Sequence, residues 1–240
     1  MKKSFLTAEW RKLLIFNYII DPEILKKYVP KGTELDLFEG KCYVSLIGFL
    51  FLNTRLLGFK IPYHSNFEEV NLRFYVKYLE NNEWKRGVVF IKELVPKAAL
   101  SFVANTVYNE HYETVKMNHS WKIEPNQLEV QYSFNFSEKT HSIKTIAENR
   151  LIEIPFGSEA EFITEHYWGY TKYSEKKTFE YGVTHPRWEM YPIISHQVKL
   201  DFQEVYGDDF ITLNELEPIS VYLAEGSNIT VEQKRTISNR

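Results

Sequence analysis

Residues 67–77 alternate between polar and apolar positions, which predicts a β-strand. From Glu69 onward one face is mainly polar: Glu69, Asn71, Arg73, Tyr75 and Lys77. The other face carries only bulky apolar residues: Val70, Leu72, Phe74 and Val76. On spacing alone, a polar face of this kind is more often solvated than buried. Because the wholly apolar face is expected to pack against helices, we expect the polar face to point inward and line a cavity.

Periodicity and turn residues predict further elements along the chain. Strands are expected at residues 13–20, 35–38, 41–52, 84–92, 120–123, 128–136, 178–184 and 193–202. Short helices are expected at residues 22–28, 97–108 and 159–168, the first opened by Asp21-Pro22 and the last capped by Ser158. Residues 56–65 are expected to form a loop, and residues 225–240 to fray.

Many strands with few short helices predict an α+β fold that is mostly β. Aromatic residues make up 16% of the chain, with 17 Phe and 16 Tyr, and aromatic enrichment favours strands. No internal repeat or linker divides the sequence. We therefore expect one domain over residues 1–240, built on a largely antiparallel sheet that could close into a barrel.

The net charge and the length of the apolar runs limit which binding partners and which cellular location are expected. The net charge of −3 argues against nucleic acid and against an anionic membrane surface. The longest apolar stretch, residues 43–52, is shorter than the ~20 residues that a membrane-spanning helix needs. No signal-peptide pattern is seen at the N-terminus, so we expect a cytoplasmic protein. The single cysteine, Cys42, excludes a disulfide within the chain and a thiolate metal cluster.

Three polar clusters are candidates for chemistry, and each has a plain structural alternative. The first is the row that begins at Glu69, where a buried Arg73 would need a carboxylate from Glu69 or Glu165. The second contains Glu161 and Glu165, one helical turn apart, which could act as an acid/base pair but are more often simply exposed. The third is His185, either a general base or a structural hydrogen-bonding group before a proline.

Other chemistries are disfavoured by missing motifs. The seven histidines include no His-x-His or His-x-x-x-His spacing, so no metal site is expected. The chain has no P-loop, no G-x-G-x-x-G sequence and no G-x-S-x-G elbow. With only 10 glycines, it offers no glycine-rich cradle for phosphates, and no cofactor is predicted.

The assembled pattern resembles the YqjF-like proteins, a bacterial family of unknown function. The resemblance is carried by residues 8–11 (AEWR) with 35–41 (LDLFEGK), by residues 67–77, and by 165–170 (EHYWGY) followed by 185–188 (HPRW). That family is similar to a distant branch of the acetoacetate-decarboxylase-like superfamily. The resemblance implies a cone-shaped, mostly antiparallel β-barrel with an internal cavity.

Acetoacetate decarboxylases use a lysine with a lowered pKa, beside a second lysine, to form a Schiff base with a β-keto acid. By resemblance, Arg11 corresponds to their cavity arginine and Glu69 to a cavity glutamate. Tyr112 and Glu113 stand where the lysine pair is expected, and neither side chain can form an imine. Three lysines lie near in sequence, each without a second lysine adjacent: Lys92, Lys97 and Lys116.

The sequence thus predicts a cavity for a small molecule that bears a carboxylate or a carbonyl group. The expected ligand-binding residues are Arg11, Glu69, Asn71, Arg73, Tyr112 and Glu165. The candidates for catalysis are Glu69, Arg73, Tyr112 and His185. Three readings stay open: an enzyme, a ligand sensor without catalysis, and a decarboxylase-like lyase with a relocated lysine. A homo-oligomer also stays open.

Overall fold

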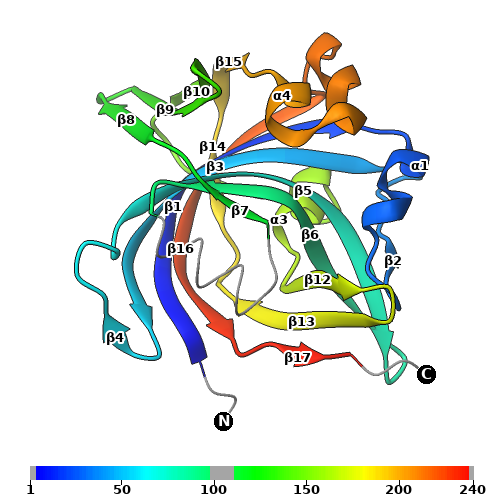
Figure 1. Cartoon of the computed structure of the whole chain (residues 1–240). Coiled ribbons are helices and arrows are strands. Elements are labelled where there is room, and N and C mark those ends of the chain that lie inside the picture. The colour runs from blue at the N-terminus through cyan, green and yellow to red at the C-terminus, as the bar shows by residue number, and fades with distance from the viewer. Residues whose placement is uncertain (1–3, 98–110, 238–240) are drawn as a thin grey trace.

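The computed structural model describes residues 4–97 and 111–237, and strands dominate it (Figure 1). The strands are β1 (Ser4–Ile19), β2 (Glu34–Leu35), β3 (Tyr43–Leu56), β4 (Phe59–Lys60), β5 (Phe67–Glu80), β6 (Glu83–Val95), β7 (Tyr112–Thr114), β8 (Met117–Ile123), β9 (Gln127–Phe136), β10 (Lys139–Glu148), β11 (Ile152–Glu153), β12 (Trp168–Ser174), β13 (Lys177–Thr184), β14 (Glu189–Tyr191), β15 (Ile193–Lys199), β16 (Ser220–Glu232) and β17 (Arg235–Thr236). The helices are α1 (Pro22–Leu25), α3 (Glu159–Thr164) and α4 (Phe202–Tyr206), with 3₁₀ turns η1 (Lys26–Tyr28) and η2 (Asp208–Glu215). The fold is mostly β with a few short helices, which confirms the predicted class.

Thirteen strands form one sheet that curves around a common interior (Figure 1). Its main run is β16–β1–β3–β5–β6–β12–β13. A further pairing of β13 with β16, which sets Val183 beside Val231, joins the two ends of that run. All neighbours are antiparallel except β6, which pairs in parallel with β7 and β12.

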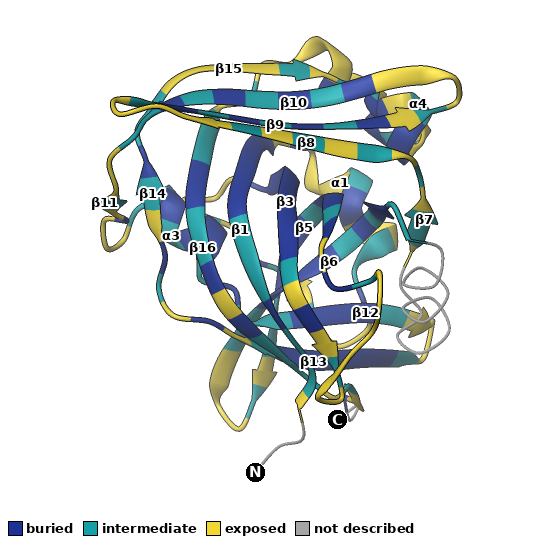
Figure 2. Cartoon of the chain, turned by 90° about the vertical axis from the view of Figure 1, so that its left-hand side faces the viewer, coloured by how far each residue is buried: buried dark blue, intermediate teal, exposed yellow. Residues whose placement is uncertain are grey.

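A second sheet of four strands, in the order β15–β10–β9–β8, lies across one end of the main sheet (Figure 2). Together with α4 and η2 it contributes to an apolar cluster that includes Leu72 of β5, Val130 of β9 and Phe202 of α4. The contact is close at Gly48, where a Cβ atom would lie 2.6 Å from Ile143 Cδ1. Glycine at this position therefore lets the second sheet approach β3.

Both faces of β5 are buried. Its apolar face, with Val70 and Phe74, belongs to the cluster under the second sheet and α4. Its other face carries Tyr75, which packs in a separate inner cluster against Phe162 of α3. The expectation that helices cover the apolar face was incomplete, because a second sheet shares that role with α4.

Several predicted elements differ in the structure. The helix expected at 159–168 ends at Thr164, and β12 begins at Trp168. The strand expected at 35–38 is reduced to β2 and an isolated bridge between Phe38 and Lys41. The strand expected to reach residue 202 ends at Lys199. The loop expected at 56–65 contains the short β4, and the helix expected at 97–108 lies almost wholly outside the described residues.

The expectation that the C-terminal region frays was wrong for residues 225–236. β16 pairs with β1 along most of its length, and β17 pairs with β13. The Arg235 side chain bonds Glu80 on β5 and the fully buried Glu180 on β13. The segment is rich in polar residues because one face of β16 is partly solvated, and low apolar content was mistaken for disorder. No helix in the described part of the chain is long and apolar enough to cross a membrane.

Candidate ligand-binding cavity

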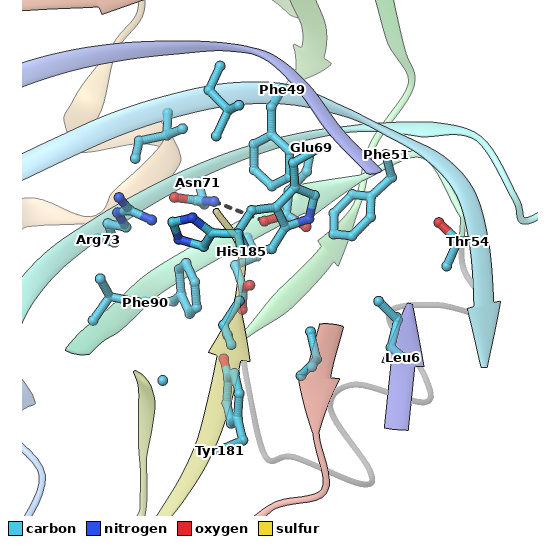
Figure 3. A pocket seen from close by; sticks show the side chains of 18 of the residues that line it. Leu6, Phe49, Phe51, Thr54, Glu69, Asn71, Arg73, Phe90, Tyr181 and His185 are labelled. Carbon is cyan, nitrogen blue, oxygen red and sulfur yellow. Dashed lines mark hydrogen bonds between the residues drawn. The ribbon is translucent and has the colours of Figure 1, made fainter. Parts of the chain in front are cut away.

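The interior of the main sheet holds a cavity of about 210 Å³. Its walls are mostly apolar and aromatic, and they come from β1, β3, β5, β6, β7, β12, β13 and β16, from the C-terminal end of α3, and from the segments that precede β5 and follow α3 and β13. The aromatic side chains include Trp10, Phe49, Phe51, Phe90 and Trp188. In close-up, Arg73 lies toward one end of the cavity, and Leu6 and Thr54 lie toward the other (Figure 3).

The polar row of β5 lies on this inner surface. Glu69, Asn71 and Arg73 all line the cavity, and Glu69 and Asn71 are only 3% and 1% exposed. The Asn71 amide donates to Glu69 Oε1 over 2.9 Å, which is the dashed bond in Figure 3. The Tyr112 hydroxyl also contacts Glu69, at 3.4 Å from Oε2. Tyr112 reaches the cavity because β7 runs in parallel beside β6, opposite Glu93.

Arg73 has no carboxylate partner within the described residues. Its Nη2 donates to the carbonyl of Ile163 at 3.2 Å, and its guanidinium lies 5.6 Å from the centre of the Tyr75 ring. Its Nε is buried and has no hydrogen bond to any described residue. The predicted partners are engaged elsewhere, because Glu69 accepts from Asn71 and Glu165 accepts from the Tyr167 hydroxyl. The prediction of a carboxylate partner for Arg73 was therefore wrong.

His185 also lines the cavity, where it stacks on Trp188 with ring centroids 4.1 Å apart. Its Nδ1 lies 2.9 Å from the Pro186 carbonyl oxygen. A carbonyl only accepts, so Nδ1 carries the proton and the neutral ring keeps its lone pair on Nε2. Burial lowers the pKa of His185, and this effect outweighs the opposite influence of the Glu165 carboxylate. His185 thus makes, through Nδ1, the structural hydrogen bond that was one of its two sequence-based interpretations. Its Nε2 keeps a lone pair.

A second histidine in the cavity wall, His166, was missed as a site residue. Its Nε2 lies 3.2 Å from Asp36 Oδ2, and the same oxygen accepts from Arg86 Nε at 2.6 Å. Burial lowers the pKa of His166 to about 4, and His166 and Arg86 hold the pKa of Asp36 below its ordinary value despite burial. The sequence placed His166 inside a helix that ends two residues earlier, so its inward direction could not be read from spacing.

Arg11 and Glu165 are not among the residues that line the cavity. Lys12 has a positive φ of 52°, and the pairing of β1 with β3 shifts between Arg11 and Leu14. Trp10 contributes to the wall, so its neighbour Arg11 takes the opposite face, where Nε bonds Glu9 at 3.0 Å. Glu165 caps the end of α3 and binds Tyr167.

No lysine lines the cavity among the described residues, and Lys2 and Lys3 are the only lysines outside them. Lys92 pairs with Glu113 at 3.1 Å, and Glu113 is 45% exposed. Lys12 is buried but bonds the Tyr191 hydroxyl at 2.8 Å and also Glu225. In the same part of the chain, no cluster of three or more His, Cys, Asp or Glu side chains is placed to hold a metal ion.

Comparisons with known proteins agree with this architecture. The sequence profile of the DUF2071 family, described as an uncharacterised conserved protein, matches residues 7–228. The chain is 28% identical to the uncharacterised protein YqjF of Bacillus subtilis (strain 168) over 219 residues, which cover 89% of this chain and 85% of YqjF.

Two solved structures show the same fold. Acetoacetate decarboxylase from Legionella pneumophila matches with a TM-score of 0.65 at 13% identity, over 98% of this chain and 87% of that one. The enduracididine biosynthesis enzyme MppR, complexed with pyruvate, matches with a TM-score of 0.67 at 12% identity, over 99% and 91%. These findings confirm the YqjF-like resemblance and the acetoacetate-decarboxylase-like fold. At identities of 13% and 12%, these two matches show a shared fold and nothing about function.

Proposed function

The chain belongs to the DUF2071 family, and on that premise we propose that it binds a small organic acid with an apolar body in the cavity beside Arg73. The carboxylate of the ligand contacts the Arg73 guanidinium. The apolar body lies against the aromatic walls, which include Phe49, Phe90 and Trp188. The ligand is held without a covalent bond.

The guanidinium of Arg73, which has no ion-pair partner among residues 4–97 and 111–237, is the observation that carries this proposal. A cation that is partly withdrawn from water loses several kcal/mol of hydration unless an anion or several hydrogen bonds replace that water. Within the described residues, Arg73 makes one hydrogen bond, to Ile163, and no ion pair. A carboxylate is the natural complement, because its two oxygens accept from two guanidinium N–H groups at once.

The rest of the cavity supports a ligand that is mainly apolar. Cavities that take small molecules are generally lined by hydrophobic and aromatic side chains with a few placed polar groups. Here Phe51 lies across the cavity from Arg73 (Figure 3), and the Trp10 ring packs edge-on against Phe51. Flat rings of this kind favour contact with an aromatic or branched aliphatic group.

The structural neighbours support an organic acid, and the side chains of this chain support non-covalent binding. MppR is described in complex with pyruvate, itself a small organic acid. An imine needs a lysine at the ligand, whereas Tyr112 and not a lysine reaches the cavity from β7. We therefore assign no Schiff-base step to this protein.

Binding by calorimetry tests the proposal. The probes are benzoate, phenylacetate and 3-phenylpropanoate, each paired with its primary amide, which keeps the shape and removes the charge. We expect at least one carboxylate to bind at least 10-fold more tightly than its amide. Arg73→Gln is expected to abolish that preference, and Arg55→Gln, at an exposed position, is expected to preserve it. Binding of no carboxylate, or an unchanged preference in a folded Arg73→Gln protein, would overturn the proposal.

Borohydride reduction tests the absence of an imine. Sodium borohydride added with pyruvate or acetoacetate is expected to leave the mass of the intact protein unchanged, because no lysine lines the described cavity. A stable adduct on one lysine, lost in a single Lys→Arg variant, would contradict non-covalent binding.

A further inference from the structure

We propose that the acid bound beside Arg73 is a hydroxy acid, with a hydroxyl group near the carboxylate that donates a hydrogen bond to His166 Nδ1. This inference rests on the proposed function, since it presumes that a carboxylate contacts Arg73. It adds the chemical class of the ligand and a residue that selects that class.

The Asp36 carboxylate determines which ring nitrogen of His166 can accept. A carboxylate accepts hydrogen bonds, so the contact of His166 Nε2 with Asp36 Oδ2 places the ring proton on Nε2. Arg86 donates to the same Asp36 oxygen and keeps the carboxyl ionised. The neutral ring then presents the lone pair of Nδ1, and this buried atom has no hydrogen-bond partner among the described residues.

His166 and Arg73 belong to the same end of the cavity. Both contact the Tyr75 ring, His166 with ring centroids 4.7 Å apart and Arg73 with its guanidinium 5.6 Å from the ring centre. Arg73 also bonds the carbonyl of Ile163, three residues before His166. One ligand end can therefore present an anion to Arg73 and a hydrogen-bond donor to His166.

The polar atoms at the Arg73 end of the cavity favour a ligand group that donates a hydrogen bond over one that accepts it. In the described part of the chain, His166 Nδ1 and Asn71 Oδ1 are both buried acceptors without a hydrogen bond, and both residues line the cavity. A ketone oxygen on the ligand would be repelled by these two acceptors, because all three atoms carry lone pairs. A methylene group would leave both acceptors without a hydrogen bond. Sites built to hydrogen-bond a hydroxyl reject analogues that lack it, because buried polar groups are then left without partners.

A hydroxyl fits this position better than an ammonium group. Burial and the nearby cations Arg86 and Arg73 disfavour a proton on His166, and its pKa is lowered for these reasons. The same surroundings disfavour a positive charge on a ligand group that contacts Nδ1. A neutral hydroxyl supplies the donor without that cost, so we infer a hydroxy acid rather than an amino acid.

A matched ligand series tests the inference. The probes share one apolar body and differ at one carbon: 3-phenyllactate, 3-phenylpropanoate, phenylpyruvate and phenylalanine. A second series built on 4-methylpentanoate covers a smaller body. We expect the hydroxy acid to bind the wild-type protein at least 10-fold more tightly than its deoxy, oxo and amino counterparts in at least one series.

Variants of His166 test whether this residue causes the preference for the hydroxy acid. His166→Phe is expected to bind hydroxy and deoxy acids equally, because the Nδ1 acceptor that distinguishes them has been removed. His166→Gln, whose amide can bond Asp36 and whose carbonyl can accept, is expected to retain part of the preference. In protein labelled with ¹⁵N-histidine, the Nδ1 resonance of His166 should be that of an unprotonated nitrogen. It should move when the hydroxy acid is added and stay when the deoxy acid is added, a readout that needs no variant.

The outcomes separate this inference from the proposed function. If hydroxy and deoxy acids bind the wild-type protein equally tightly, the carboxylate site stands and the role of His166 is wrong. If the amino acid bound the wild-type protein more tightly than the hydroxy acid, the hydroxyl assignment would be wrong and the carboxylate site would stand. If no acid of either series binds, both proposals fail.

Discussion

The buried ring of His166 is expected to make the protein less stable at mildly acid pH. Burial lowers its pKa to about 4 from the ordinary value of 6.5. Well above pH 6.5 neither the folded nor the unfolded chain protonates this ring, and it contributes nothing to the pH dependence. As the pH falls from 6.5 toward 4, the unfolded chain takes up a proton that the folded protein resists. The free energy of unfolding therefore decreases across this window.

The size of the effect follows from the two pKa values. Each pKa unit corresponds to about 1.36 kcal/mol, so the fall from 6.5 to about 4 corresponds to about 3 kcal/mol. Most of that, about 2.5 kcal/mol, is expressed between pH 7 and pH 4.5. Asp36 does not mask it, because its lowered pKa keeps the carboxyl ionised throughout this range.

Urea unfolding of the wild type and His166→Gln at pH 7.0, 5.5 and 4.5 measures the effect. Glutamine does not titrate, and its amide can still donate to Asp36. Groups that titrate in both proteins cancel, so the variant should gain about 2–2.5 kcal/mol relative to the wild type between pH 7.0 and pH 4.5. His196→Gln, at an exposed position on β15, should follow the wild type. Parallel pH profiles for wild type and His166→Gln would refute the reasoning.

Two further changes test the packing of the fold. Gly48→Ala should lower the free energy of unfolding by about 1–3 kcal/mol. The added Cβ would lie 2.6 Å from Ile143 Cδ1 and push the second sheet outward. An unchanged midpoint in urea titrations would contradict that close contact. Arg235→Ala should cost about 1–3 kcal/mol, less than a fully unpaired buried charge would, because Glu180 keeps Lys85 at 3.2 Å. Arg150→Ala is the exposed control, and equal unfolding free energies for the two variants would show that the Arg235 side chain adds nothing to stability.

The sequence predicted individual strands well where alternation was long and regular. β5 is the clearest case, since its period-two pattern required no partner to be recognised. β16 was missed because a strand with one partly solvated face carries few apolar residues, and its pairing with β1 depends on residues more than 200 positions away. β12 was missed because residues before it were assigned to a helix that ends at Thr164.

The candidate site was predicted in part. Glu69, Asn71, Arg73, Tyr112 and His185 lie around one cavity, as the polar pattern and the resemblance led us to expect. Two other expectations failed for geometric reasons. A single bulge at Lys12 sets the face that Arg11 takes, and the cap of α3 turns Glu165 toward Tyr167. Neither a bulge nor a helix end is visible in residue spacing alone.

The sequence by itself determined that β5 has one polar and one apolar face, because alternation is a local property of an extended chain. Only the tertiary structure decided that the polar face borders a cavity. That outcome depends on the second sheet and α4, which cover the apolar face. The tertiary structure also brings Asp36 to His166 across 130 positions of sequence, and so determines which ring nitrogen carries the proton. Long-range packing sets such contacts, and no local pattern encodes them.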